Sequence, residues 1–220
     1  YSFIIYFDFW AYSIMAIGLG RLFGIELPRN FRQPYSAFSP KEFWRLWHIT
    51  LSYWIRDYLY IRLGGNRRYV TSILIAFLAT GLWHGAGTNF LIWGLYHACL
   101  VVCYHWTKKW WDVLPKWCGI AITFSLVSLG WPLFYLDSSS WLDLIREIFS
   151  FRGTGEPIYI ARHWGVLIAL AAWTFFVRDE FWLFNEKRRI IFDSPIVHAS
   201  TIILCILLFS FGREFIYFRF

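Results

Sequence analysis

Charged residues are scarce in this chain of 220 residues, and one long stretch has none. Lys, Arg, Asp and Glu make up only 16% of the sequence, whereas 58% is hydrophobic and 23% is aromatic. An ordinary soluble domain carries about 25% charged residues, so this balance is too apolar for one. Residues 70–106 contain no Lys, Arg, Asp or Glu, and they can therefore lie at the depth of the lipid hydrocarbon. The composition predicts a multi-pass membrane protein.

Cysteines are also few, and their spacing excludes the common structural motifs. The chain has four, and none belongs to a C-x-x-C pair, which argues against a zinc site or a disulfide framework. We expect them to be small residues of the apolar core. They are Cys99, Cys103, Cys118 and Cys205.

The start of the chain lacks both an initiator Met and the charged n-region of a signal peptide. The chain opens at Tyr1, inside an apolar segment. We therefore expect it to be the C-terminal part of a longer protein.

Basic residues outnumber acidic ones and give a formal net charge of +7. Nine of the 21 Lys and Arg lie within residues 21–68, so the positive-inside rule places that segment in the cytoplasm. Anionic membrane lipid accounts for the basic excess there, and no nucleic-acid partner is expected.

Five apolar stretches are candidate membrane spans: residues 1–20, 70–106, 117–136, 164–177 and 196–211. The second is about 37 residues long, where about 20 suffice to cross a bilayer. Gly81, Gly85 and Gly87 surround His84 near its centre. This pattern predicts two helices broken near mid-depth, which return to the side on which they began. The loop at 137–162 then lies outside, and the basic residues at 108–116 and 187–189 lie inside.

Residues 40–63 have the pattern of helices that lie on a membrane surface. Apolar residues recur at helical spacing, and charged residues interrupt any long apolar run, which predicts two short amphipathic helices at the cytoplasmic interface. Ser39 before Pro40 and Glu42 forms a helix start signal. The glycines of Gly64-Gly65-Asn66 end the second helix. The apolar positions are Phe43, Trp47, Leu51, Trp54 and Tyr58.

Ordered sequence blocks give this chain a resemblance to a known family. They lie at residues 30–35, 42–52, 54–66, 81–85 and 93–97, and the ending at 215–220 is similar too. Together they resemble the membrane-bound O-acyltransferase family, and most closely its bacterial branch. That branch contains the alginate O-acetyltransferase and the teichoic-acid D-alanylation membrane subunits.

The resemblance implies an all-α polytopic transmembrane bundle with interfacial amphipathic helices and a broken, re-entrant helix pair. Residues 1–220 would be the C-terminal part of one such domain, whose N-terminal half is absent from this chain. His84 would be the catalytic histidine, in a tunnel through the membrane, and His48 would be the second histidine of the family pattern. Neutral imidazole suits this role, because it removes the proton of an alcohol near pH 7.

The resemblance also implies a reaction and its partners. An acyl group, with acetyl favoured, would pass from a cytoplasmic thioester to a hydroxyl of an exported polysaccharide or other cell-envelope glycan. The donor would be acetyl-CoA or an acylated carrier protein, and an acyltransferase or esterase-like partner would act on the outer side of the bacterial inner membrane. D-alanyl transfer to teichoic acid is the alternative within this class. A non-catalytic transporter or scaffold subunit is the alternative outside it.

Five further residues are candidates for substrate binding: Trp83, Asn66, Arg62, Asp57 and His97. Arg62 and its basic neighbours could bind a phosphorylated donor, an acidic carrier protein or anionic lipid. Asp57 is expected to pair with a nearby Arg, or else to orient His48. His97 either packs in the core or joins the site, and His84 could itself be a buried histidine bonded to a backbone carbonyl. Neither a metal site nor a resident cofactor is expected.

Overall fold

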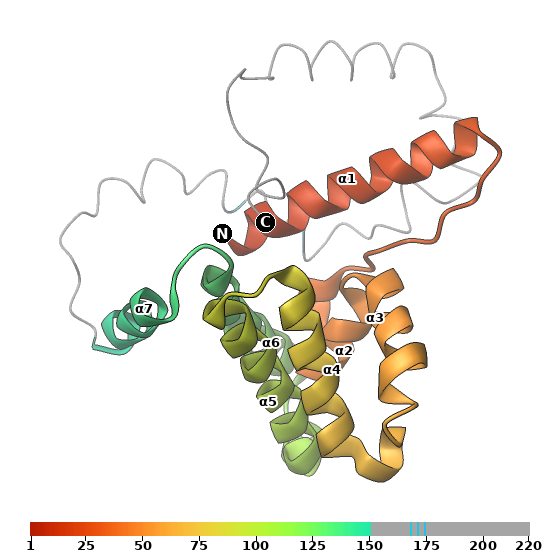
Figure 1. The fold of residues 1–220 in the computed structure, drawn as a ribbon. Coiled ribbons are helices and arrows are strands. Elements are labelled where there is room, and N and C mark those ends of the chain that lie inside the picture. Colours follow the sequence, from red (N-terminus) through yellow and green to blue (C-terminus); the bar gives the residue numbers. More distant parts are fainter. Residues whose placement is uncertain (151–167, 169–170, 172–173, 175–220) are drawn as a thin grey trace.

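The structure is a computed structural model, and it describes residues 1–150 together with Ile168, Ala171 and Thr174. Every regular element within residues 1–150 is helical (Figure 1). The all-α prediction is therefore confirmed. Apart from those three residues, the predicted span at 164–177 lies outside the described residues, and so do the span at 196–211, the basic residues at 187–189, the block at 215–220 and Cys205.

Three helical stretches are long and apolar enough to cross a membrane. They are α1 (Ser2–Leu22), α5 (Thr88–Trp111), and α6 (Lys116–Gly130) with its continuation η4 (Trp131–Phe134). The spans predicted at 1–20 and 117–136 are therefore confirmed as apolar helices of spanning length.

The charge-free stretch at 70–106 folds as a hairpin of α4 (Tyr69–His84) and α5, with the turn between them at residues 85–87. The start of α4 and the end of α5, which are the ends away from this turn, lie at the same end of the molecule (Figure 1). The two backbones approach closely, because a Cβ on Gly94 would come within 2.5 Å of the Phe77 carbonyl oxygen. A Cβ on Gly81 would clash in the same way with the Phe90 carbonyl. The prediction of a broken helix pair is confirmed, and small residues allow its close packing.

The segment at 40–63 forms two short helices, as predicted, namely α2 (Pro40–Leu46) and α3 (Ile49–Ile55). A π-helical turn, η2 (Arg56–Tyr60), continues α3. The Ser39 hydroxyl accepts a hydrogen bond from the Glu42 amide at 3.2 Å and so caps α2. The chain then turns at Gly64 and Gly65, which have φ angles of 108° and 52°, and passes through η3 (Gly65–Arg68) into α4. Glycine tolerates these left-handed conformations.

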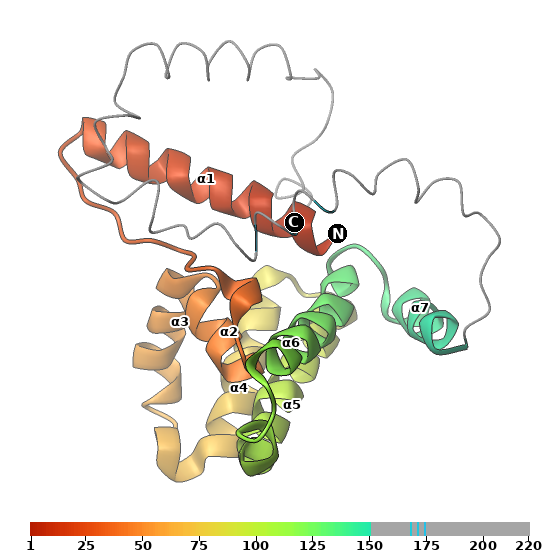
Figure 2. The same cartoon turned by 180° about the vertical axis from the view of Figure 1, so that it is seen from behind.

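The five apolar residues of this segment do not share one environment. Phe43 and Trp47 are buried, whereas Trp54 and Tyr58 are 56% and 64% exposed. The helix α2 packs one face against α3, α5 and α6 (Figure 2) and leaves Arg45 exposed, which is the amphipathic pattern predicted, and the place of both helices at a membrane interface stays a prediction. Burial of large aromatic rings in a shared core favours this position.

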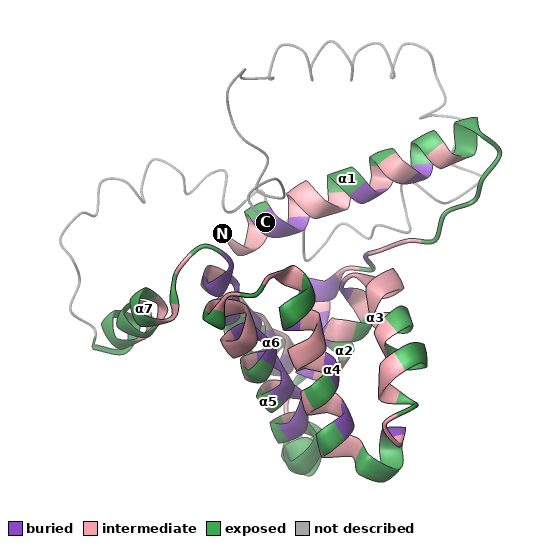
Figure 3. Ribbon diagram, viewed as in Figure 1, coloured by how far each residue is buried: buried purple, intermediate pink, exposed green. Residues whose placement is uncertain are grey.

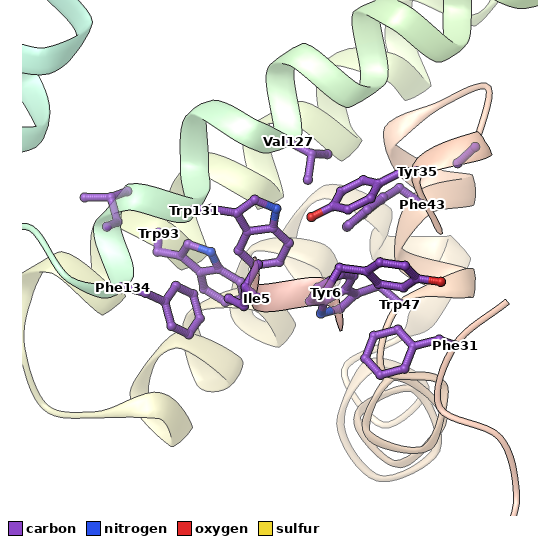
Figure 4. Packing of buried hydrophobic residues seen from close by; sticks show 12 residues of the cluster. Ile5, Tyr6, Phe31, Tyr35, Phe43, Trp47, Trp93, Val127, Trp131 and Phe134 are labelled. Carbon is purple, nitrogen blue, oxygen red and sulfur yellow. The ribbon is translucent and has the colours of Figure 1, made fainter. Parts of the chain in front are cut away.

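An aromatic core holds these helices together (Figure 4). It joins α1, the short helix η1 (Pro34–Ser36), α2, α5 and η4, and its rings meet edge to face or stacked, which are favourable geometries. Its large members are Tyr6, Phe31, Tyr35, Phe43, Trp47, Trp93, Trp131 and Phe134.

The outer loop predicted at 137–162 contains a helix that the sequence analysis did not predict. Residues 138–150 form helix α7 (Ser138–Ser150) within the expected outer loop, and Asp137 begins it by accepting the amides of Ser139 and Ser140. The helix has no buried residue (Figure 3).

The predicted role of the cysteines as core residues is wrong for Cys99 and Cys103. Both are exposed free thiols on α5, while Cys118, also free, is half-buried. The first two lie on a face of α5 that no other described helix covers, which periodicity within one apolar run could not reveal.

Candidate functional site

A cavity of about 870 Å³ runs along α3 and α4, between α1 and the aromatic core. Its wall is largely apolar, and two groups of polar residues lie toward its ends. A rise of about 1.5 Å per residue puts the two ends of α4, and hence the two groups, roughly 22 Å apart. The group at the start of α4 contains Lys41, Arg45, Tyr60, Asn66 and Tyr69, and the group at its end contains Asp8, His48 and His84.

His84 is the last residue of α4, and its ring lies in an aromatic cage. The ring centroids of Trp83, Trp93 and Phe134 lie 4.9, 5.2 and 4.9 Å from its own. Among the described residues, none forms a hydrogen bond with either ring nitrogen of His84, and the alternative of a carbonyl-bonded histidine finds no partner there. A ring nitrogen of His84 is thus free to accept a proton from a molecule in the cavity.

His48 lies between α2 and α3 in the left-handed conformation, with φ of 43°. Its ring packs edge to face on Phe9 at 4.8 Å, and its Nδ1 lies 3.2 Å from Oδ1 of Asn30. Burial lowers the pKa of His48 to about 4, so the imidazole is neutral near pH 7.

The two histidines line the same cavity, although they come from different helices. Trp83 lines it too, and its ring lies 6.2 Å from that of His48 and 4.9 Å from that of His84. The fold therefore brings three of the predicted site residues together.

The other predicted site residues lie apart from the histidines. Asn66 lines the opposite end of the cavity and accepts a hydrogen bond from the Tyr60 hydroxyl at 2.8 Å. Arg62 is exposed and does not line the cavity. Asp57 pairs with Arg56 at 2.6 Å, which confirms the predicted pairing. Asn30, and not Asp57, contacts His48.

His97 lies outside the cavity and is fully buried. The rings of Trp44, Trp93 and Trp131 surround it at 4.9, 5.0 and 5.8 Å. Gly130 provides space for it, because a Cβ there would lie 2.5 Å from Nε2 of His97. Of the two alternatives for this residue, its position matches packing.

Sequence reasoning missed three basic residues that line the cavity, of which Arg56 pairs with Asp57, whereas Lys41 and Arg45 lie at its basic end. The Lys41 ammonium lies 5.6 Å from the centre of the Tyr69 ring. Burial, together with the positive charges of Arg45 and Lys108, lowers the pKa of Lys41. Within the described residues, neither Lys41 nor Arg45 pairs with a carboxylate. This end of the cavity is therefore suited to an anion. Arg45 belongs to the second sequence block, which was the available signal for that residue.

The sequence model of the membrane-bound O-acyltransferase family matches residues 1–131, which are more than half of the chain. The chain belongs to the membrane-bound O-acyltransferase family. The match contains both cavity histidines, the hairpin and every large member of the aromatic core except Phe134. In the described part of this family member, no three His, Cys, Asp or Glu side chains gather as a group that could hold a metal ion.

Curated relatives of this O-acyltransferase family member are named for acyl transfer. The chain is 46% identical to a peptidoglycan O-acetyltransferase of Helicobacter pylori over 142 residues, which cover 61% of this chain and 27% of that protein. It is 45% identical to the alginate O-acetylase AlgI of Pseudomonas syringae, with the same coverage. It is 36% identical to the teichoic acid D-alanyltransferase of Bacillus subtilis, covering 61% of this chain and 39% of that protein. The chain thus spans well under half the length of these relatives.

Proposed function

We propose that this chain is part of a membrane O-acyltransferase of the bacterial inner membrane. The enzyme moves an acyl group, with acetyl favoured, from a cytoplasmic thioester to a hydroxyl of an exported polysaccharide or other cell-envelope glycan. The observation that carries the proposal is the pair of histidines in one largely apolar cavity whose other end is basic. The relatives named for acetyl transfer to peptidoglycan and alginate support the choice of group and acceptor.

The chemistry assigned to His84 follows from the bonds that change. A carbon–oxygen bond forms between the acyl carbon and the hydroxyl, and the carbon–sulfur bond of the thioester breaks. His84 takes the hydroxyl proton as the new bond forms and gives it to the departing thiolate, so the products are an ester and a thiol and the imidazole ends neutral. The aromatic cage of His84 limits the access of water that would hydrolyse the thioester.

The basic end of the cavity is the proposed entrance for the donor. The phosphates of acetyl-CoA, or of the prosthetic arm of an acidic carrier protein, would meet Lys41 and Arg45 there. The exposed Arg62, Arg67 and Arg68 near the same end would contact the carrier protein or anionic lipid. An acyltransferase or esterase-like partner would act on the outer side, beside the exported glycan.

Replacing Lys41 or Arg45 with alanine is expected to raise the KM for the thioester donor roughly threefold to tenfold, since a partly solvated ion pair contributes about 1 kcal/mol. The kcat should change little, because neither residue lies near His84. Donor titrations of the full-length enzyme in membranes measure both constants. Lys109→Ala, which removes an equal charge from an exposed position on α5 outside the cavity, is the matched control. An unchanged donor KM in both cavity variants would remove this entrance from the proposal.

The proposed reaction is tested by the ester-linked groups on the cell envelope. Mild base releases these groups from envelope glycan of cells with and without the full-length gene. Loss of acetate from the deletion strain, restored by the wild-type gene, is the expected result. Loss of D-alanine would instead establish D-alanyl transfer, which the 36% identical teichoic acid relative keeps as the second candidate. If the amount of every ester-linked acyl group stays unchanged, acyl transfer is excluded and a transporter or scaffold role takes its place.

A further inference from the structure

Asn30, the first residue of the sequence block at 30–35, binds His48 and its neighbours from the loop after α1. We propose that Asn30 is a positioning residue that holds His48 as the tautomer with the proton on Nδ1. The Nε2 atom of His48 is then a hydrogen-bond acceptor in the cavity, and it orients the glycan by accepting from a hydroxyl next to the one that reacts. This inference rests on the proposed acyl transfer to a glycan.

The Asn30 residue bonds successive residues at the start of α3. Its backbone carbonyl accepts the Ile49 amide at 2.9 Å. Its side-chain Oδ1 accepts the Thr50 hydroxyl at 2.6 Å and lies 3.4 Å from the Thr50 amide. Its Nδ2 donates to the Ser13 hydroxyl of α1 at 3.2 Å. The loop, α1 and α3 are therefore tied together at this one residue.

These bonds determine which atom of the Asn30 amide faces His48. A backbone N–H can only donate, so the side-chain atom that faces the Thr50 amide is the oxygen. That same oxygen lies 3.2 Å from Nδ1 of His48. Because an amide oxygen only accepts, the proton of this hydrogen bond belongs to Nδ1. The lone pair of the neutral imidazole then lies on Nε2, across the ring from Asn30.

The backbone of His48 supports a functional reason for this arrangement. Its φ of 43° is uncommon for a residue with a side chain. Such conformations persist where several neighbouring contacts hold them in place, and they cluster at functional sites. Here, Asn30 contacts three residues in a row, His48, Ile49 and Thr50.

The chemistry of the two reactants indicates what Nε2 binds. A thioester group offers a carbonyl oxygen and a sulfur, and both are acceptors. The reacting hydroxyl has a single proton, which His84 takes. A sugar ring carries further hydroxyls on adjacent carbons, and one of these can donate to His48 while its neighbour reacts. A fixed acceptor at this point thus selects how the glycan lies in the cavity.

The tautomer is measured directly by solid-state ¹⁵N NMR of the full-length protein with labelled histidine in lipid membranes, with the His48 signals assigned by their loss in His48→Gln. We expect a protonated Nδ1 and an unprotonated Nε2 in the wild type, and a mixture of tautomers in Asn30→Ala. A protonated Nε2 in the wild type would overturn the proposal without any measurement of activity, so its failure is separate from failure of the proposed function.

Transfer assays at pH 8, with envelope glycan of the producing strain as acceptor, test the consequence. Asn30→Ala is expected to raise the KM for the glycan and to lower kcat/KM roughly 10- to 100-fold, the loss typical when a group that orients a metal-bound histidine is removed. The KM for the thioester should stay unchanged. Asn30→Asp keeps an accepting oxygen and should restore most of the activity, whereas Ser13→Ala, which removes the other bond of the same amide, should behave as wild type. If Asn30→Asp loses as much transfer activity as Asn30→Ala at equal protein level, Asn30 only supports the fold.

Discussion

Replacing His84 with alanine is expected to lower acyl transfer about 10²–10⁴-fold, the usual contribution of a general base. The side chain lines the cavity at the end of α4, and its ring nitrogens have no hydrogen-bond partner among the described residues. Its removal therefore takes away the proposed proton acceptor without breaking a hydrogen bond that the described fold uses. Incorporation of radiolabelled acetyl into envelope glycan, by membranes that carry the full-length protein at matched expression, measures the loss.

Two further variants make the result on His84 specific. His84→Gln keeps a polar side chain of similar reach but cannot take up the proton near pH 7, so it should be as inactive as alanine. His105→Ala removes an exposed histidine at the other end of the hairpin and should retain activity. Full incorporation of label by both His84 variants would exclude this residue as the base and favour a transporter or scaffold subunit.

The hairpin and its histidine could be predicted from the sequence because their signals are local. The charge-free run is too long for one span and has glycines around His84. Few folds of such a run can hydrogen-bond all of its backbone N–H and C=O groups within lipid. The Ser39 cap and the Gly64-Gly65 turn are equally local, and the structure has both.

The remainder of the site depends on contacts between segments far apart in the sequence. Asn30 meets His48 only because the loop after α1 returns to the start of α3. Lys41 and Arg45 reach the cavity only because α2 packs beside α3, a contact that the pattern of a single helix does not indicate. His97 and His84 both stand in apolar runs of similar appearance, but only His84 faces the cavity. Periodicity gives the face of a helix but not the partner of that face.

The second large expected effect is a loss of stability when a side chain is added where α4 and α5 pack closely. Gly81→Ala and Gly94→Ala each place a methyl group against a backbone carbonyl of the opposite helix, namely that of Phe90 or Phe77. A backbone carbonyl cannot rotate away as a side chain can, so the helices must separate. Overpacking of this kind typically costs about 1–3 kcal/mol. We expect lower thermal stability of the full-length protein in detergent and lower abundance in membranes.

Gly18→Ala is the matched control for this prediction, because a Cβ at Gly18 on α1 would have no heavy atom within 4 Å. It should leave stability nearly unchanged. The two hairpin variants should also lose activity in the fraction that still folds, since His84 ends α4 within one helical turn of Gly81 and a displacement of about 1 Å can cost roughly 100-fold in rate. Wild-type stability and wild-type transfer in Gly81→Ala would show that α4 and α5 do not pack in the way that positions His84.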